Sequence, residues 1–494
     1  MSVYARRPLT LDGLLRRAAQ RWPDRPALEA PAGVFRYSEF DAAVTAAAAG
    51  LRDAGVRPGD RVAVALSHDA LLSAVPFVAS RAGCSALLLN TALPAVQWAR
   101  QLAAVQPAVC VADAPHLDRM RAAAPRVRLV TAPDDVSLDP ASAADDPALE
   151  VCENAPVVLL ATSGTTAEPK VIPLTNRGLI HAGLAYLDLL PWGDAERSLV
   201  VMPLYYIGAL STQTVPMPLI GGCNVVPADT RAAAAAREIV ERRITFVDAV
   251  PSWLGLLVRQ PPFSAPRWRS LVHGGSPMPA ATAAALAAAH PGLAMFDVWG
   301  LSEAHGPVTA HRYDPERPPA AGVVGRPLTG LRVRARAPAG DAAPGEAGEL
   351  EVHGPTVMAG YVNRPATIRR GGWLPTGDVG SVDGSGAVRV LARAKDVIDR
   401  GGRTIHSVEV EAALRSVAGV LDAAVYGTPD PVAGEAVAAA LVLDPAAELD
   451  IPALRAAVRE RVGGHAVPRL VRVVDDLPRN AAGKVDKRRL RRAD

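Results

Sequence analysis

The residues best suited to chemistry stand at 162–170, where TSGTTAEPK joins two apolar runs. Thr162, Ser163, Thr165 and Thr166 offer hydroxyl donors, Gly164 lets backbone N–H groups approach a ligand, and Lys170 supplies positive charge. Such a set can hold phosphate. It is not a Walker-type loop, because no second glycine precedes the lysine and VIPLT at 171–175 predicts a strand instead of a helix. An ordinary hydroxyl-rich turn has the same composition, so the stretch alone leaves both interpretations open.

Lysine is rare in this chain, which makes each lysine a candidate for chemistry. Of the 53 Lys and Arg residues only four are lysines, at Lys170, Lys395, Lys484 and Lys487. A site that needs a compact ammonium group on a flexible stem cannot freely accept a planar guanidinium. The competing explanation for any one of these four lysines is that it is present by chance and has no chemical role. The basic run from Lys487 to Arg492 is interpreted as a solvated helix end.

Two further segments could complete a nucleotide site. DVWGLSEAHG at 297–306 places the flat ring of Trp299, next to Gly300 and Ser302, beside the carboxylate of Glu303. An indole can stack on a base, and a carboxylate can help to hold Mg²⁺. In WLPTGDVG at 373–380, Asp378 could accept both ribose hydroxyls or merely cap a turn. We expect all of these residues in loops.

The last two segments lie toward the C-terminus. ARAKD at 392–396 brings Arg393 and Lys395 to a junction between two regions, and LPRNAAGK at 477–484 places Lys484 in a glycine turn. Each segment alone is at least as well explained by a structural role.

The elements around these segments predict the fold class. Strand-like and helix-like runs alternate from Arg61 to about residue 290, which favours largely parallel sheets covered on both faces. Within this region, 209–220 is expected to be one helix. From about 322 to 393 short strands and turns predict a β-rich section, and 395–494 predicts a small α+β domain. The chain is therefore expected to be α/β, with a large N-terminal domain of doubly wound sheets plus a β subdomain, and a small C-terminal α+β domain, for which the family resemblance described below implies mobility.

Composition excludes several classes. The chain has 494 residues, 49% hydrophobic and 21% charged, with a formal net charge of +3, so neither disorder nor a nucleic-acid surface is indicated. The N-terminus lacks the apolar core of a signal peptide, and Arg81 and Gly83 interrupt the longest apolar region, so no membrane span is expected. The four cysteines show no paired spacing and are interpreted as buried free thiols in a reducing cytoplasm.

Taken together, the order and spacing of these segments resemble the adenylate-forming superfamily of acyl- and aryl-CoA synthetases, peptide-synthetase adenylation domains and firefly-type luciferases. The resemblance runs from GLRDAGVRPGDRVAVAL near 51–66, through GELEVHGPTVMAGY at 348–361, to PRNAAGK at 478–484. It implies that ATP and Mg²⁺ take part, with CoA as a probable co-substrate. Glu303 would hold the Mg²⁺, and Lys170, Glu303, Lys484 and Thr165 would act in catalysis. Residues implied at the ATP or AMP site are Thr162, Ser163, Gly164, Thr165, Thr166, Lys170, Gly275, Ser276, Pro277, Trp299, Gly300, Ser302, Asp378, Arg393 and Lys484.

The resemblance also implies a second half-reaction. The small domain would rotate about a hinge at Lys395, withdrawing Lys484 and bringing Gly402 beside the thiol of CoA. The acid would lie against Tyr206, Ile207, Gly208, Gly274, Leu301, His305 and Gly306, and the bulk of Tyr206 and Ile207 favours a short or flat acid. Departures from the family pattern are Ala167, Val171, Tyr206, Ala392, Thr404 and Ser407. None of them removes a charged group.

The expected function is an ATP-dependent acid:CoA ligase (AMP-forming) that activates a small or aromatic carboxylic acid. The alternative is a stand-alone adenylating enzyme that passes the activated acid, or another oxyanion, to a carrier protein or other nucleophile. No carrier domain follows residue 494, so a carrier is expected on a separate chain. A catalytically inactive nucleotide-binding scaffold is the third possibility. The protein is expected to be a cytoplasmic monomer or homodimer.

Overall fold

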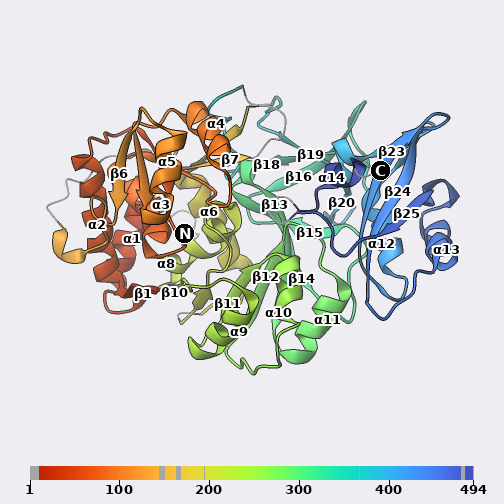
Figure 1. Ribbon diagram of the computed structural model, residues 1–494, viewed down its shortest axis with the longest axis horizontal. Helices are drawn as coiled ribbons and strands as arrows, with labels where there is room; N and C mark the ends of the chain where they lie inside the picture. Colours follow the sequence, from red (N-terminus) through yellow and green to blue (C-terminus); the bar gives the residue numbers. More distant parts are fainter. Residues whose placement is uncertain are drawn as a thin grey trace.

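The computed structural model describes residues 10–143, 149, 151–162, 168–193, 195–365, 368–479 and 484–492, with the side chain of Thr162 excepted. Three sheets follow one another along the long axis of the molecule, from the N-terminal part at one end to the C-terminal part at the other (Figure 1). The expected α/β fold class is confirmed.

The first sheet has six strands in the order β6-β5-β3-β4-β7-β8, all parallel except β8 at the edge. Alternate residues of β3 enter different cores: Val62 and Val64 face α2 and α3, whereas Ala63 and Ala65 face α4 and α5. Burial on both faces explains why these strands are continuous apolar runs. The elements are β3 (Arg61–Ala65), β4 (Ser85–Leu88), β5 (Val109–Asp113), β6 (Arg128–Ala132), β7 (Pro156–Thr162), β8 (Lys170–Thr175), α1 (Leu11–Arg21), α2 (Tyr37–Asp53), α3 (Ala70–Ala82), α4 (Ala95–Val105) and α5 (Leu117–Ala123).

The second sheet is longer than expected, because the β-rich section continues it. Its parallel part is β1-β10-β9-β11-β12-β13, and antiparallel β14 and β15 join it to the hairpin strands up to β17 in one 14-stranded sheet. The strands are β1 (Pro26–Ala30), β2 (Gly33–Arg36), β9 (Arg197–Leu199), β10 (Cys223–Val225), β11 (Phe246–Ala249), β12 (Ser270–Gly274), β13 (Ala294–Leu301), β14 (Gly306–Tyr313), β15 (Val323–Pro327), β16 (Arg332–Ala337), β17 (Gly340–Asp341), β18 (Gly348–His353), β19 (Leu374–Val382) and β20 (Val388–Arg393).

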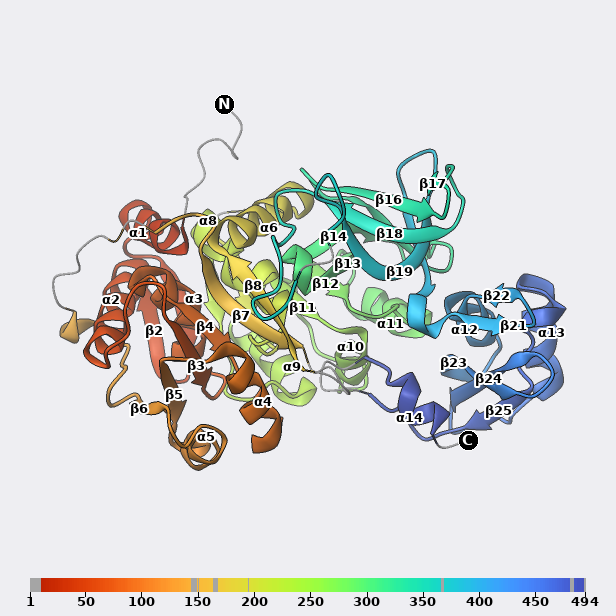
Figure 2. The ribbon, with the colours of Figure 1, turned by 90° about the horizontal axis from the view of Figure 1, so that it is seen from above.

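Helices cover both faces of the parallel part. Tyr186 of α6 (Asn176–Leu189) packs with Phe246, Val272 and Phe296 on one face. The opposite face is covered by α9 (Ala232–Glu241), α10 (Pro251–Leu257) and α11 (Ala280–Ala289). Figure 2 shows α6 next to β7 and β8, the edge pair of the first sheet. The alternation of strands and helices that was expected from Arg61 onward, with largely parallel sheets covered on both faces, is present.

The prediction of a single helix over 209–220 is wrong. The structure has α7 (Ile207–Ala209), a π-helical turn at Leu210–Thr214 and α8 (Pro216–Ile220). Pro216 has no N–H to continue a helical ladder, and the hydroxyls of Ser211 and Thr212 bond the backbone oxygens of Ile207 and Gly208 at 2.9 and 2.8 Å. These local bonds replace a regular helix.

The C-terminal part has a five-stranded sheet of its own, with β21, β22, β23, β24 and β25. Helices α12 and α13 cover one face, and Leu490 of α14 packs with Tyr426 on the other. The elements are β21 (Ile398–Arg400), β22 (Arg403–Ile405), β23 (Val420–Asp430), β24 (Gly434–Leu443), β25 (Leu470–Val473), α12 (Ser407–Arg415), α13 (Ile451–Arg461) and α14 (Lys487–Arg491). No helix among the described residues is long and apolar enough to cross a membrane.

The cysteine prediction is right for three residues and wrong for one. All four thiols are free; Cys84, Cys110 and Cys223 are buried, whereas Cys152 is exposed. Burial raises the pKa of each of the three buried thiols to about 12, which removes them as nucleophiles at neutral pH.

Candidate active site

Trp299, Asp378 and Arg393 meet where strands β13, β19 and β20 come together. Asp378 Oδ2 accepts a hydrogen bond from the indole Nε1–H of Trp299 at 3.2 Å, and its Oδ1 lies 2.9 Å from Arg393 Nε. Asp378 and Arg393 are also direct cross-strand partners. Trp299 and Asp378 were expected in loops, and that expectation is wrong: both are on strands, which hold them more rigidly than a loop would. Arg393, which was expected at a junction, is the last residue of β20.

The carboxyl of Asp378 is nearly buried, and burial raises its pKa, against the effects of Arg393, Trp299 and Lys484. Gly300 follows Trp299 at a bulge between β13 and β14. A Cβ at Gly300 would lie 2.0 Å from the backbone oxygen of Gly306, so only glycine fits there.

Lys484 approaches this cluster from the C-terminal part. A Cβ built on Gly275, which has φ +81°, would be 3.8 Å from Lys484 Cε. The lysine therefore lies over the turn 274–277, which includes Ser276 and Pro277 and follows β12. The Lys484 residue as a whole is exposed, but its ammonium group lies among protein atoms. The resulting desolvation lowers the pKa of Lys484, and the positive charge of Arg393 lowers it further. An anionic ligand at this point would oppose this lowering of the pKa.

Glu303 is held by a segment that the sequence analysis did not assign. It lies in the 3₁₀ turn Ser302–Ala304, directly after Leu301 at the end of β13. The hydroxyl of Tyr361 donates to Glu303 Oε1 at 3.1 Å, and the N–H of Met358 donates to the Glu303 backbone oxygen at 2.9 Å.

The hydroxyl-rich stretch closes a hairpin between β7 and β8. Thr162 and Lys170 are cross-strand partners at its base, and the strand predicted after Lys170 is present. Ser163, Gly164, Thr165, Thr166 and Ala167 lie outside the described residues. Lys170 Nζ lies 5.4 Å from the centre of the Tyr361 ring, within the range of a cation–π contact. Lys170 and Glu303 therefore share one neighbour.

Of the residues expected to line the acid pocket, Tyr206, Ile207, Gly274 and Gly306 have small, apolar or aromatic neighbours, and His305 is an exception. A Cβ at Gly306 would be 2.4 Å from Ser211 Oγ and 3.7 Å from Ile207 Cγ1, and one at Gly274 would be 2.5 Å from the backbone oxygen of Val298. Tyr206 accepts a hydrogen bond from Asn90 Nδ2 at 3.2 Å and its ring meets that of Tyr205 edge-on at 4.9 Å. Rings and small residues therefore lie on the side where the acid was expected to bind, the expected acid side.

His305 is the exception. Its Nδ1 is 2.6 Å from the backbone oxygen of Thr356, its Nε2 accepts the N–H of Thr175 at 2.8 Å, and it is 1% exposed. Burial lowers its pKa to about 4, so the ring is neutral and donates from Nδ1. Both nitrogens are thus engaged by backbone. His305 ties two parts of the chain together instead of presenting a polar atom to an acid.

Asp248 stands beside this acid side and was missed by the sequence analysis, since nothing local marks it. A Cβ at Gly208 would be 3.4 Å from Asp248 Oδ2, and the Thr212 hydroxyl lies 2.6 Å from the same oxygen. Asp248 is 7% exposed, and burial raises its pKa to about 6.

The remaining predicted residues are in the C-terminal part. Gly402 has φ +79° in the β21–β22 turn, and a Cβ there would meet nothing within 4 Å. Lys395 is exposed in the 3₁₀ turn Ala394–Asp396. Lys487 is not a solvated helix end: its Nζ lies 2.7 Å from Glu411 Oε1 and 2.9 Å from Ser407 Oγ. The use of a lysine at position 487, in a chain where lysine is rare, has a structural explanation, because a compact ammonium group fits between these two side chains.

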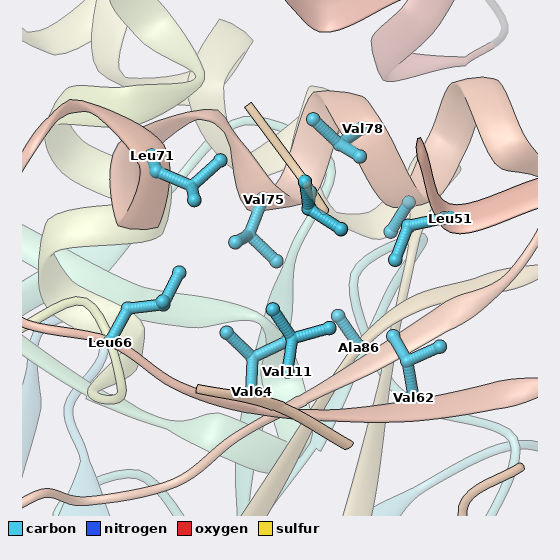
Figure 3. Close-up of a pocket in the computed structure, with 11 residues that line it drawn as sticks. Leu51, Val62, Val64, Leu66, Leu71, Val75, Val78, Ala86 and Val111 are labelled. Atoms are coloured by element: carbon cyan, nitrogen blue, oxygen red, sulfur yellow. The ribbon is translucent and has the colours of Figure 1, made fainter. Parts of the chain in front are cut away.

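A small apolar hollow in the first part of the chain is unrelated to this cluster. Figure 3 shows that it is lined by aliphatic side chains, from Leu71, Val75 and Val78 on α3 and from Val62 and Val64 on β3. None of its lining residues can donate or accept a proton with its side chain. It is a packing feature of the core.

The donor set fits Mg²⁺ bound together with a triphosphate. Among the residues that the structure describes, no three His, Cys, Asp or Glu side chains form a metal cluster, so the protein offers Glu303 and not a complete cage. Mg²⁺ is commonly held by one or two carboxylates plus substrate phosphates and water. Glu303, oriented by Tyr361, satisfies that requirement.

Comparison with known proteins agrees with this geometry. Residues 15–362 match the family model described as AMP-binding enzyme, and 409–484 match the AMP-binding enzyme C-terminal domain. A feruloyl-CoA synthase of Amycolatopsis sp is 35% identical over 96% of this chain and 97% of that protein. ATP-bound MatB of Rhodopseudomonas palustris superposes with a TM-score of 0.87 at 27% identity, covering 98% and 99% of the two chains. An amide bond synthetase of Marinactinospora thermotolerans gives 0.87 at 28% identity, with the same coverage.

The chain therefore belongs to the AMP-binding enzyme family of the adenylate-forming superfamily, as the motif resemblance predicted. It is an AMP-forming ligase of the acyl-CoA synthetase type.

Proposed function

We propose that this enzyme joins a small or aromatic carboxylic acid to CoA, with ATP converted to AMP and pyrophosphate. The observation that carries the proposal is the convergence of Lys484 with Gly275, Asp378 and Arg393, which are far apart in the sequence. A nucleotide bound over the 274–277 turn, with its ribose at Asp378, would present its α-phosphate to Lys484. The ligase relatives and the ATP-bound neighbour support the same reaction class.

In the first half-reaction, a carboxylate oxygen of the acid attacks the α-phosphorus and pyrophosphate leaves. Lys484 would hold the carboxylate and the α-phosphate, where negative charge concentrates during the displacement. Lys170 and the hydroxyl-rich stretch would hold the β- and γ-phosphates. Glu303 would hold Mg²⁺, which supplies charge neutralisation on the phosphates when it is bound.

In the second half-reaction, the thiol sulfur attacks the acyl carbon and AMP leaves with the electron pair of the broken C–O bond. Rotation of the C-terminal part about Lys395, with Gly402 brought to the thiol, is part of the proposal. Thr404 and Ser407, where the family usually has Asn and Pro, follow Gly402 closely in the sequence. The enzyme would act in the cytoplasm.

The acid is proposed to be flat. The edge-on pair Tyr205 and Tyr206, the tight contact between Gly306 and Ser211, and the relative named feruloyl-CoA synthase all support an aryl or arylpropenoic acid over a long unbranched chain.

The test is acid-dependent exchange of labelled pyrophosphate into ATP across short, long-chain and aryl acids, followed by thioester detection with CoA. We expect exchange and thioester with aryl acids. Exchange without any thioester would overturn CoA as acceptor and favour a carrier protein or an amine, whereas absence of exchange with every acid would overturn adenylation itself.

Lys484→Ala separates the two half-reactions. Because Lys484 acts only in the first, the variant should lose at least about a hundredfold of the exchange rate yet keep thioester formation from supplied acyl-adenylate, in line with the loss of one preorganised charge-stabilising donor. Undiminished exchange would contradict the role given to Lys484.

A further inference from the structure

One connection between β18 and β19 reaches back to the first sheet and touches both charged groups assigned to the phosphates. This connection, residues 356–363, belongs to the β-rich section, yet it runs along the edge strand β8. At one end His305 links the Thr356 oxygen to the N–H of Thr175, the last residue of β8. The connection is therefore fixed to β8 at that strand's carboxyl end.

At the other end of the connection, the side chain of Asn363 forms hydrogen bonds with the backbone on both sides of Lys170. Its Nδ2 donates to the backbone oxygen of Pro169 at 2.8 Å, and its Oδ1 accepts the N–H of Val171 at 3.1 Å. The N–H of Val362 also donates to the Val171 oxygen at 2.9 Å. The side-chain amide thus acts like a neighbouring strand at the exposed edge of β8, and it fixes the peptide groups on both sides of Lys170.

Between these two anchors, Tyr361 contacts the active-site groups themselves. Its hydroxyl bonds Glu303 Oε1, while its ring lies 5.4 Å from Lys170 Nζ and 5.2 Å from Arg364 Cζ. One oxygen of Glu303 is therefore engaged by a donor, which sets the direction of the other. Partners of this kind orient a metal-binding carboxylate, and losing them typically weakens metal affinity about 10- to 100-fold.

We propose that Tyr361 and Asn363 are positioning residues for the phosphate end of ATP: Tyr361 orients Glu303 toward Mg²⁺, and Asn363 fixes the backbone that carries Lys170. The inference rests on the proposed adenylation of an acid. It goes beyond that proposal because it assigns the two contributions to phosphate binding to different side chains of one connection. Tyr361 acts through the Mg²⁺ held by Glu303, and Asn363 acts through the ammonium group of Lys170.

The test measures nucleotide binding without turnover, as the rise in melting temperature that ATP causes during a Mg²⁺ titration. Tyr361→Phe removes only the hydroxyl and keeps the ring beside Lys170. We expect it to need about tenfold more Mg²⁺ for half of the wild-type rise and to reach the full rise at saturating Mg²⁺. Tyr426→Phe, in the C-terminal core, is the matched control and should titrate like the wild type.

Asn363→Ala should weaken ATP binding at every Mg²⁺ concentration, because its effect passes through Lys170. In a protein that already carries Lys170→Ala, the Asn363→Ala change should therefore weaken ATP binding little further. A double-mutant cycle measures this coupling between the two residues. The melting temperature without ligand reports any loss of stability separately for each variant.

The outcomes are distinguishable from failure of the proposed function. If the wild type shows no Mg²⁺-dependent response to ATP, adenylation itself is overturned. If the wild type responds and Tyr361→Phe has the same Mg²⁺ midpoint, the role of Tyr361 is overturned. If the effects of Asn363→Ala and Lys170→Ala simply add, the role of Asn363 is overturned.

Discussion

At the scale of single residues, Asp248 shows how burial changes a side chain. The Thr212 hydroxyl has one proton but two acceptors in reach, the Gly208 oxygen at 2.8 Å and Asp248 Oδ2 at 2.6 Å. A protonated Asp248 satisfies both, by donating to Thr212 while Thr212 donates to Gly208. The raised pKa of about 6 for Asp248, caused by burial, agrees with this arrangement.

Asp248→Asn is expected to stabilise the fold at neutral pH. With the folded-state pKa raised above the ordinary value, the folded protein binds a proton that the unfolded chain has lost between about pH 4 and pH 6, so wild-type stability falls as pH rises through that window. Removing the carboxyl removes this penalty, by up to about 3 kcal/mol for a shift of about two units. Thermal unfolding should show a larger gain at about pH 7.5 than at about pH 5.

The control for this prediction is Asp118→Asn, whose carboxyl belongs to a 98% exposed side chain and should give no such pH-dependent gain. An Asp248→Asn variant that is destabilised equally at both pH values would instead mean that the charged carboxylate is needed by the fold.

Asp378→Asn is expected to weaken ATP binding about tenfold or more, because hydrogen bonds to charged groups contribute about 1.5–3 kcal/mol. The change keeps the size of the side chain but removes the charge opposite Arg393. The dissociation constant of ATP, measured by equilibrium binding, reports this loss of affinity. Asp383→Asn makes the same substitution in the exposed turn of the same hairpin, where Asp383 only caps Ser385 and Ala387, and should bind ATP normally.

At the scale of elements, α6 packs closely against His305. A Cβ at Gly178 would be 2.3 Å from His305 Cδ2, and the ring cannot move away without breaking its bonds to Thr175 and Thr356. The helix and the 356–363 connection are therefore coupled through one imidazole.

Gly178→Ala should destabilise the protein by about 1–3 kcal/mol through overpacking, although alanine is the better helix former by about 1 kcal/mol. Because the displaced ring holds Thr356, the response to ATP and Mg²⁺ should weaken as well. Thermal unfolding with and without ligand measures both. Gly384→Ala, where a Cβ would meet nothing within 4 Å, should change neither; a harmless Gly178→Ala would show that the contact relaxes easily.

At the scale of the whole molecule, the arrangement seen here places Lys484 over the turn 274–277, where we propose that the nucleotide binds. Arg389 of β20 and Glu409 of α12 form an ion pair of 3.0 Å between the 14-stranded sheet and the C-terminal part. Both side chains are partly exposed, so the pair is worth at most about 1 kcal/mol and is screened by salt.

Glu409→Gln should therefore lower pyrophosphate exchange by at most about fivefold at low ionic strength, since it weakens a contact of the adenylate-forming arrangement. Thioester formation from supplied acyl-adenylate should not fall, and the difference in exchange should shrink at high salt. Glu460→Gln, on the exposed side of α13, removes the same charge as a control. A salt-independent loss in both half-reactions would point to misfolding instead of a shifted arrangement.

The sequence by itself determined the reaction class and most of the elements, because periodicity, turn residues and motif order are local properties. It predicted site roles for Trp299, Glu303, Asp378, Arg393 and Lys484, and the strand after Lys170 excluded the Walker-type loop. Only the tertiary structure decided what each residue touches. That Asp378 is on a strand beside Trp299, that His305 binds backbone, and that Tyr361 reaches Glu303 all depend on pairing between residues 51 to 130 positions apart. Local pattern carries no information on such pairing, since strand register and the path of a long connection are set by the packing of the whole fold.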